Sequence, residues 1–357
     1  MYWMDLSTEQ IEEVMASFGA PKFRSRQVEQ WLRRGVRPMD MTNLPLALRQ
    51  QMDTIPFGGA TIYQKHLSQR DGTVKYLFLL EDGNLVEGVL MRYHYGNTVC
   101  LSTQIGCNMG CRFCASTLEG CVRNLRHGEM LSFLAEIERD EPPKDGRSRT
   151  VTNIVLMGSG EPLDNYENVV TFLKRVTSEN GPNISPRNIS LSTCGLVPKI
   201  LTFIDDAPHV TLSISLHAHD NETRSELMPV NRAYPLEQLI DAARTYADRT
   251  GRRVVFEYAL IHGKNDSRAD AEALAKRLKG LMCHVNLIPL NPVRERGLQG
   301  VTRTYARQFS EWLEQLHISA TVRREMGTDI EGACGQLRRR VIHESRSSNG
   351  SGQTEAE

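Results

Sequence analysis

The sequence lacks any run that approaches the roughly 18 uninterrupted apolar residues of a membrane-spanning helix. Its first residues, MYWMDLSTEQIEE, also lack the basic region and the apolar stretch that are typical of a signal peptide. The sequence therefore indicates a cytoplasmic protein that does not associate with a membrane.

Cysteine is scarce, with 8 residues in a chain of 357, which is too few for a disulfide-stabilised scaffold. An excess of charge is also missing, because 43 Lys and Arg balance 43 Asp and Glu. With 40% hydrophobic residues, this composition excludes a disordered or collagen-like chain. A nucleic-acid partner would have to be held by local basic patches, since no protein-wide positive field attracts phosphates.

The chain is long enough for one large domain or for two to three domains of about 150 residues. Residues 1–56 have the apolar spacing of three helices, the first of which Ser7 can cap. Residues 57–94 alternate between apolar and polar positions in VKYLFLL and NLVEGVLM, on either side of a turn. We expect a helical accessory domain over 1–56 and linking strands over 57–94.

After Tyr95, apolar β-branched runs alternate with helical segments, which predicts right-handed βαβ crossovers and a parallel sheet. Six such units predict an α/β fold, a partial (βα)₆ barrel over 95–343 with its active residues at the carboxyl ends of the strands. The polar residues 344–357 are expected to be a disordered tail. The expected strands are TVCLSTQI, TNIVLMG, NISLSTCG, VTLSISLH, VVFEYALI and HVNLIPLN, with helices near 128–139, 164–178, 236–249, 267–280 and 303–315.

The strongest chemical signal is CNMGCRFC, in which Cys107, Cys111 and Cys114 have CxxxCxxC spacing just after the first expected barrel strand. Three thiolates in one short loop can bind three irons of a 4Fe-4S cluster. The fourth iron then lacks a local ligand and can chelate a substrate. The alternative is a zinc site or a set of buried thiols, but zinc prefers four ligands and paired CxxC spacing.

This loop resembles that of the radical SAM superfamily, and longer segments resemble the RlmN/Cfr family of RNA adenosine methyltransferases over nearly the whole chain before the tail. The resemblance implies a radical SAM barrel with an RNA-directed helical domain, one 4Fe-4S cluster, and two molecules of S-adenosylmethionine per turnover as methyl donor and radical source. The matching segments are 100–125, 157–165 (MGSGEPLDN), 191–198 (LSTCGLVP), 213–218 (SISLHA), 227–231 (LMPVN), 257–266 (EYALIHGKND), 286–292 (NLIPLNP) and 329–337 (DIEGACGQL).

In the family scheme, Cys334 is first methylated on sulfur, and a 5′-deoxyadenosyl radical then takes hydrogen from that methyl group. The carbon radical adds to adenine and forms an enzyme–RNA crosslink. Cys100, seven residues before Cys107, matches the resolving cysteine, which implies a transient Cys100–Cys334 disulfide. Glu87 matches the glutamate beside the target base and could accept the ring proton. From the residues alone, Glu87 is more simply an exposed strand glutamate.

By resemblance, contacts to S-adenosylmethionine are expected from the strand ends. The residues alone leave plainer interpretations open: a tight turn for GSGEP, a hydrogen-bonded core residue for His217 and a strand-end cap for Ser192. Three further cysteines match no catalytic position and are expected to be buried or semi-buried thiols: Cys121, Cys194 and Cys283. The expected contacts are Gly160, Glu161, Ser192, Ser215, Leu216, His217 and Asn291.

Two sets of basic residues suggest contacts with RNA phosphates. Around Trp31 the alternative is a solvated helix face with a core tryptophan, and near Cys334 the sequence does not show where the side chains point. The first set is Lys22, Arg24, Arg26, Arg33 and Arg34, and the second is Arg323, Arg324 and Arg338 to Arg340.

Two activities occur in the family, methylation of adenosine at carbon 2 and, in Cfr-type proteins, at carbon 8. Pro162 and Leu163 of GEPL resemble the carbon 2 side, whereas Cfr-type proteins typically carry alanine in place of this proline. Ser159 departs from the commoner methionine. The resemblance thus implies methylation of carbon 2 of adenosine 2503 in 23S rRNA and of adenosine 37 in certain tRNAs.

We expect the rRNA substrate to be protein-free or in early assembly, because a target base must be splayed from its stack to enter a barrel. Other expected properties are an electron donor such as flavodoxin and a monomeric chain. Two other hypotheses remain, a non-catalytic iron-sulfur RNA-binding module and a different radical SAM enzyme such as a glycyl-radical activase. The outlying Cys100 and Cys334 favour the methyltransferase over both.

Overall fold

The computed structural model describes residues 1–143, 146, 148–179, 181–291 and 294–330. Cys334 and the tail expected over 344–357 lie outside these residues, as do Arg338 to Arg340. Among the described residues, no helix is both long and apolar enough to cross a membrane.

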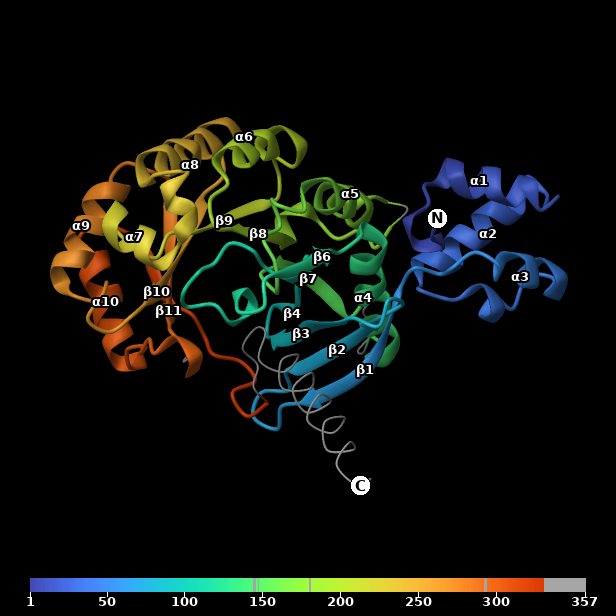
Figure 1. Ribbon diagram of the computed structural model, residues 1–357, viewed down its shortest axis with the longest axis horizontal. Coiled ribbons are helices and arrows are strands. Elements are labelled where there is room, and N and C mark those ends of the chain that lie inside the picture. The colour runs from blue at the N-terminus through green and yellow to red at the C-terminus, as the bar shows by residue number, and fades with distance from the viewer. Residues whose placement is uncertain (144–145, 147, 180, 292–293, 331–357) are drawn as a thin grey trace, which may run out of the picture.

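The N-terminal residues form a helical unit with its own apolar core, seen at one end of the molecule in Figure 1. Trp3 and Met52 are fully buried, and the Trp3 indole donates a hydrogen bond of 2.8 Å to the Met52 carbonyl. Ser7 forms a capping box with Gln10, which confirms the expected helix start. The elements are η1 (Trp3–Asp5), α1 (Thr8–Ser17), α2 (Lys22–Arg33), η2 (Pro38–Asp40) and α3 (Leu46–Met52).

Four antiparallel strands follow: β1 (Ala60–Leu67), β2 (Val74–Leu80), β3 (Leu85–Tyr93) and β4 (Gly96–Leu101). They pair in chain order, so the expected strands VKYLFLL and NLVEGVLM are confirmed as β2 and β3. Since β3 pairs with β4, the ladder is continuous with the barrel sheet.

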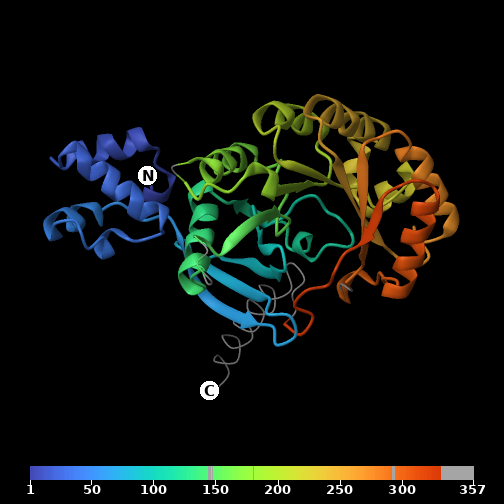
Figure 2. The same cartoon turned by 180° about the vertical axis from the view of Figure 1, so that it is seen from behind.

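The remaining strands of the ten-stranded sheet are parallel, in the order β4-β7-β8-β9-β10-β11-β12. Their helices lie on the outer side of the curved sheet (Figure 1, Figure 2), as βαβ crossovers require. This confirms the expected partial barrel. The strands are β7 (Val151–Leu156), β8 (Ile189–Thr193), β9 (Thr211–Ser215), β10 (Val254–Leu260), β11 (Cys283–Pro289) and β12 (Ala320–Val322). The helices are α4 (His127–Asp140), α5 (Tyr166–Thr177), α6 (Val197–Asp206), α7 (Asn221–Leu227), α8 (Leu236–Thr250), α9 (Arg268–Leu278) and α10 (Arg303–Gln315).

Several short elements lie in the connections between the barrel strands and helices. The strands β5 (Gln104–Gly106) and β6 (Cys121–Asn124) form a separate two-stranded sheet, with η3 (Ala115–Thr117) between them. This small sheet encloses residues 107–120, which include the three clustered cysteines. The other 3₁₀ turns are η4 (Pro186–Asn188), η5 (Pro229–Arg232) and η6 (Arg294–Arg296).

Candidate active site

The cysteine loop is closed at its base by backbone contacts. The Cys107 N–H donates to the Gly120 carbonyl at 3.0 Å, and the Thr117 hydroxyl contacts the carbonyls of Cys111 and Cys114 at 3.1 and 3.0 Å. A Cβ on Gly106 would lie 1.9 Å from the Gly120 carbonyl oxygen, so only glycine fits there. The loop therefore has a fixed base and turns its cysteines toward the protein.

Two of the three thiols, those of Cys107 and Cys111, are buried, and Cys114 is half-buried. Burial raises the pKa of Cys107 to about 12 and also raises that of Cys111, and neighbouring thiol and carboxyl charges act in the same direction. Thiolates crowded in this way need a cation to compensate their charge. Soft sulfur ligands suit iron-sulfur clusters, so the donor set of this loop fits such a cluster.

The arrangement differs from that of a site for a single ion. Among the described residues, no three His, Cys, Asp or Glu side chains converge on one ion-sized point. A 4Fe-4S cluster does not need them to converge, because each cysteine sulfur binds a different iron. The cluster assignment for Cys107, Cys111 and Cys114 stays a prediction.

The GSGEP turn follows β7 and packs against the chain that leads into the cysteine loop. A Cβ on Gly158 would lie 2.6 Å from the Ser102 nitrogen, and a Cβ on Gly160, at φ +104°, would lie 2.6 Å from Gln104. These glycines therefore allow close backbone packing within the protein. Their predicted approach to S-adenosylmethionine stays a prediction.

Glu161 is buried beneath this turn, where its carboxylate accepts backbone hydrogen bonds from Leu163 at 3.0 Å and Cys194 at 2.8 Å. Burial raises the pKa of Glu161, while these N–H donors act against that rise. The carboxylate thus joins the ends of β7 and β8 next to the cysteine loop. Its remaining lone pairs are the ones that could accept a ligand amino group.

The other predicted ligand contacts follow neighbouring strands, as expected for a barrel. Ser192 lies near the end of β8 and Ser215 ends β9, and both are half-buried. Leu216 is buried and donates its N–H to the Glu257 carbonyl at 3.0 Å. Asn291 is exposed just beyond β11.

His217 is 3% exposed and has a left-handed φ of 57°. Its Nδ1 accepts the Ala259 N–H at 2.9 Å, so the neutral ring carries its proton on Nε2. Burial lowers the pKa of His217 to about 3. The ring of Phe113, from the cysteine loop, packs edge-on at 4.5 Å. His217 is therefore a hydrogen-bonded core residue that also supports the cysteine loop.

Arg224 was missed by the sequence analysis, although it ties the strand ends together. Its side chain is fully buried and donates to the carbonyls of Cys194, Ser215 and Leu216 at 2.8 to 3.1 Å and to the Asn231 side chain at 3.0 Å. Burial lowers the pKa of Arg224 to about 10. The only sequence feature that pointed to this region was the LMPVN segment, which contains its hydrogen-bond partner Asn231.

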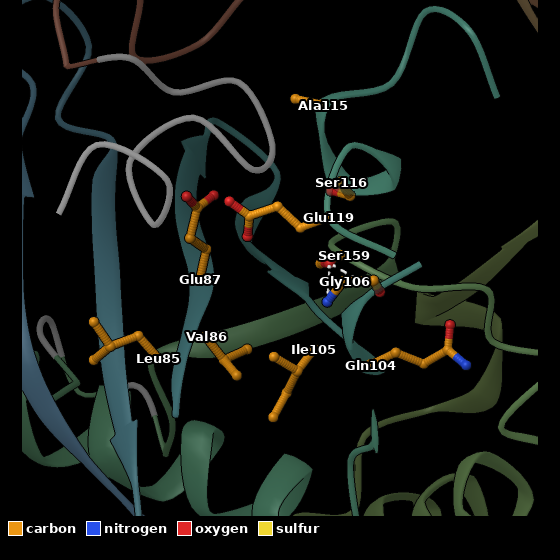
Figure 3. Close-up of a pocket in the computed structure, with 10 residues that line it drawn as sticks. All are labelled: Leu85, Val86, Glu87, Gln104, Ile105, Gly106, Ala115, Ser116, Glu119 and Ser159. Carbon is orange, nitrogen blue, oxygen red and sulfur yellow. Dashed lines mark hydrogen bonds between the residues drawn. The ribbon is translucent and has the colours of Figure 1, made fainter. Parts of the chain in front are cut away.

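Glu87 and Cys100 lie on the inner face of the antiparallel ladder. Cys100 is 6% exposed and pairs with Val89, two residues from Glu87. The carboxylate of Glu87 is buried, so the interpretation of an exposed strand glutamate is wrong. It lines a small pocket with Ser116 and Glu119, and Figure 3 shows the carboxylates of Glu87 and Glu119 turned toward one another.

The three remaining cysteines are buried or half-buried, as expected. They are not equivalent, because Cys194 packs in one apolar cluster with Cys111. Cys283 begins β11, pairs with Val254 and packs against the main apolar core of the barrel. Cys283 is therefore the better control position for work on the site.

Residues after β12 cross the inner face of the sheet and attach to the β1–β2 turn. Met326 packs against the apolar cluster that includes Cys100. The carboxylate of Asp329 accepts from the Ser68 hydroxyl at 2.6 Å and from the Gln69 N–H at 2.9 Å. We call residues 323–330 the strap. Cys334 follows Asp329 by five residues in the sequence and lies outside the described residues.

Several basic residues of the N-terminal helices already have partners within that unit. Lys22 pairs with Glu12 at 3.2 Å and Arg33 with Glu29 at 2.7 Å, while the Arg34 guanidinium lies 4.8 Å from the centre of the Trp31 ring. These contacts are those of a solvated helix face. Whether the face also contacts RNA phosphates stays a prediction.

Two protein-family models match this chain, one over its N-terminal helical unit and one over most of its barrel. The model described as the ribosomal RNA large subunit methyltransferase N-terminal domain matches residues 3–56, and the model described as the radical SAM superfamily matches residues 101–275. A probable dual-specificity RNA methyltransferase RlmN of Alkaliphilus oremlandii is 50% identical over 341 residues, 95% of this chain and 98% of that protein. A protein of the same description from a Thermoanaerobacter species is 47% identical over 343 residues, again 95% and 98%.

The fold also matches a solved structure over most of its length. The crystal structure of a radical SAM methyltransferase from Sphaerobacter thermophilus superposes with a TM-score of 0.88 at 43% identity, covering 94% of this chain and 98% of that chain.

Proposed function

The chain belongs to the RlmN type of radical SAM RNA methyltransferases, and on that basis we propose that it methylates carbon 2 of adenosine, at position 2503 of 23S rRNA and position 37 of certain tRNAs. Members of the superfamily use S-adenosylmethionine and a 4Fe-4S cluster. Here the cluster would be held by Cys107, Cys111 and Cys114.

One observation carries this proposal. A buried thiol, a buried carboxylate and the cysteine loop meet at the same side of the barrel: Glu87 lines a pocket with Ala115 and Ser116, which directly follow Cys114, and Cys100 lies on the inner face of the same ladder. A non-catalytic iron-sulfur module has no use for the buried thiol and carboxylate beside its cysteine loop. A methyltransferase that must remove a proton and break a carbon–sulfur bond uses both.

The chemistry requires a radical because carbon 2 of adenine lies between two ring nitrogens and is too electron-poor to attack a methyl sulfonium. In the proposed sequence the Cys334 thiolate first takes the methyl group of one S-adenosylmethionine, forming a sulfur–carbon bond. When bound, the cluster supplies and takes back the single electron that begins and ends the radical steps. One hydrogen of the methyl group on Cys334 would be taken up in 5′-deoxyadenosine, and the methylene carbon that is left becomes bonded to carbon 2 of the adenine.

Release of the RNA then depends on two residues of the ladder. Glu87 accepts the proton of carbon 2, and the sulfur of Cys100 bonds to that of Cys334 as the carbon–sulfur bond breaks. The methylene carbon takes a proton and becomes the methyl group. The disulfide holds two cysteines in oxidised form, so an external electron donor such as flavodoxin must reduce it before the next turnover.

The test is anaerobic reconstitution with methyl-labelled S-adenosylmethionine, a reductant, and either protein-free 23S rRNA fragment or tRNA, followed by mass spectrometry of the nucleosides. We expect 2-methyladenosine from the unchanged protein and from Cys283→Ala, and none from Cys334→Ala. Formation of 8-methyladenosine would retain the mechanism but assign the Cfr-type product. Absence of methylated adenosine from both RNAs would overturn the proposed substrate.

A further inference from the structure

Lys75 of β2 is a fully buried lysine with no role in the scheme above. The antiparallel register places Lys75 opposite Val89, and Glu87 opposite Leu77. Residues two apart on a strand share a face, so Lys75 and Glu87 are diagonal neighbours on one face of the ladder. Cys100 lies on that face too, since it also pairs with Val89.

The two charged groups form an ion pair inside the protein. The Lys75 Nζ lies 3.2 Å from the Glu87 Oε2, and the two side chains are 0% and 8% exposed. Removing both charges from water is expensive, and a well-packed apolar pair of similar volume is often as stable or more so. A buried ion pair at this position is therefore better explained by chemistry than by packing.

The surroundings of Glu87 explain why a cation is needed there. Its carboxylate faces the pocket that it shares with Ser116 and Glu119, and in Figure 3 the two carboxylates point toward one another. Two negative charges in such a place repel, so an ammonium group on the β2 side helps to hold the Glu87 carboxylate in position.

We infer that Lys75 is a positioning residue for Glu87: its ammonium group holds that carboxylate aimed into the pocket, ready to take the proton of carbon 2 of the crosslinked adenine. In this step the carbon–hydrogen bond breaks, its electron pair stays on the ring, and an oxygen–hydrogen bond forms on Glu87. Lys75 keeps its own proton throughout. This inference rests on the proposed function.

The experiment compares reconstituted full-length Lys75→Met and Lys75→Arg with the unchanged protein. The matched control is Lys65→Met, because Lys65 on the neighbouring strand β1 also pairs with a carboxylate, that of Asp140 at 2.7 Å. Lys65 is half-exposed, and since it pairs with Tyr76 its side chain lies on the opposite face of the ladder from Lys75. Three quantities are followed: 5′-deoxyadenosine formed, covalent protein–RNA adduct on denaturing gels, and 2-methyladenosine released.

For Lys75→Met we expect normal formation of 5′-deoxyadenosine and accumulation of the protein–RNA adduct. Release of methylated RNA should be slowed about tenfold, which is less than the rate enhancement that a general base itself contributes. RNA deuterated at carbon 2 should then show an isotope effect on release that is larger than with the unchanged protein. Lys75→Arg should restore release to within about threefold, because it keeps the cation. Lys65→Met should behave like the unchanged protein.

Two results would overturn the inference alone: release by Lys75→Met at the normal rate, or an equal loss of 5′-deoxyadenosine, adduct and product, which marks a purely structural role. If the unchanged protein forms no methylated adenosine, the proposed function fails, and the inference fails with it. The unchanged protein therefore distinguishes the two failures.

Discussion

Arg224 shows how one side chain can hold the carboxyl ends of two barrel strands. Its hydrogen bonds go to four neutral oxygens, those of Cys194, Ser215, Leu216 and Asn231. Because both the buried cation and these acceptors are withdrawn from water, each depends on the others being present.

We expect Arg224→Met to lower the free energy of unfolding by about 3 kcal/mol, because buried acceptors are left without donors. Arg224→Lys should lose less, since an ammonium group can still serve some of the carbonyls. Urea denaturation measures both, with Arg268→Met as the control, because Arg268 is largely exposed on α9. Equal midpoints for Arg224→Met and Arg268→Met would contradict this role.

Residue roles were predictable where spacing is local, and not where they depend on distant partners. The CxxxCxxC spacing needs only one loop, so it could be identified directly. Arg224 lies in the polar helix NETRSEL, which by itself predicts a solvated arginine. Its burial arises because α7 packs over the ends of β8 and β9, which no local pattern encodes.

Among the elements, most of the long periodic ones were predicted, whereas the helices α6 and α7 and the short strands β5 and β6 were missed. VPKILTFIDD forms α6 although it contains a proline, because Pro198 occupies the first turn, where a missing N–H is harmless. The strands β5 and β6 are three and four residues long, too short for an alternating pattern to be recognised. These two strands nevertheless fix the base of the cysteine loop.

The strap is the element whose attachment most directly concerns the Cys334 segment. Besides the two bonds to Asp329, the Gly327 N–H donates to the Asp71 carboxylate at 2.9 Å and Arg70 contacts the Thr328 hydroxyl at 3.1 Å. The hydrogen bond from Ser68 lowers the pKa of Asp329, so the attachment holds above the ordinary carboxyl range and weakens only as the pH falls through it. It is thus intact at neutral pH.

We expect Asp329→Ala and Ser68→Ala to slow methylation of Cys334 by about tenfold, because small displacements of a reacting group are costly. Formation of 5′-deoxyadenosine should fall in step, because the 5′-deoxyadenosyl radical takes its hydrogen from the methyl group on Cys334. Mass spectrometry of the protein after incubation with S-adenosylmethionine and the reduced cluster, without RNA, measures Cys334 methylation, and chromatography measures 5′-deoxyadenosine. The exposed Asp248 on α8 provides the control, Asp248→Ala. Normal Cys334 methylation in both strap variants would show that the attachment does not position this cysteine.

For the molecule as a whole, alternation of strands and helices was enough to predict the partial barrel. It was not enough to predict how the 57–94 strands meet it. The pairing of β3 with β4 makes one continuous sheet, and this brings Glu87 from a polar position in NLVEGVLM into a buried pocket. Long-range strand pairing of this kind depends on the assembled fold, so a strand glutamate cannot be classed as buried from its own segment.

The helical N-terminal unit is joined to the barrel by polar contacts and by Leu131 of α4, which packs against the apolar core of the unit. The Asp5 carboxylate pairs with Arg126 and accepts the Gly128 N–H at 3.1 Å, in the first turn of α4, where the helix dipole favours a negative charge. Arg175 of α5 donates to the Met4 carbonyl at 2.8 Å. Beside these contacts lies a cleft of about 890 Å³ between the two parts.

We expect Asp5→Asn to loosen this junction at a cost of about 1–2 kcal/mol, since a neutral amide replaces a charge-assisted acceptor. Because the cysteine loop lies in the other part of the chain, 5′-deoxyadenosine formation without RNA should be unchanged. If the helical unit is RNA-directed, KM for a long rRNA fragment should rise severalfold while kcat stays the same. Limited proteolysis between the parts and steady-state kinetics measure these effects, with the exposed Asp40→Asn as control. An unchanged KM together with faster proteolysis would show that the junction serves folding and takes no part in presenting RNA to the barrel.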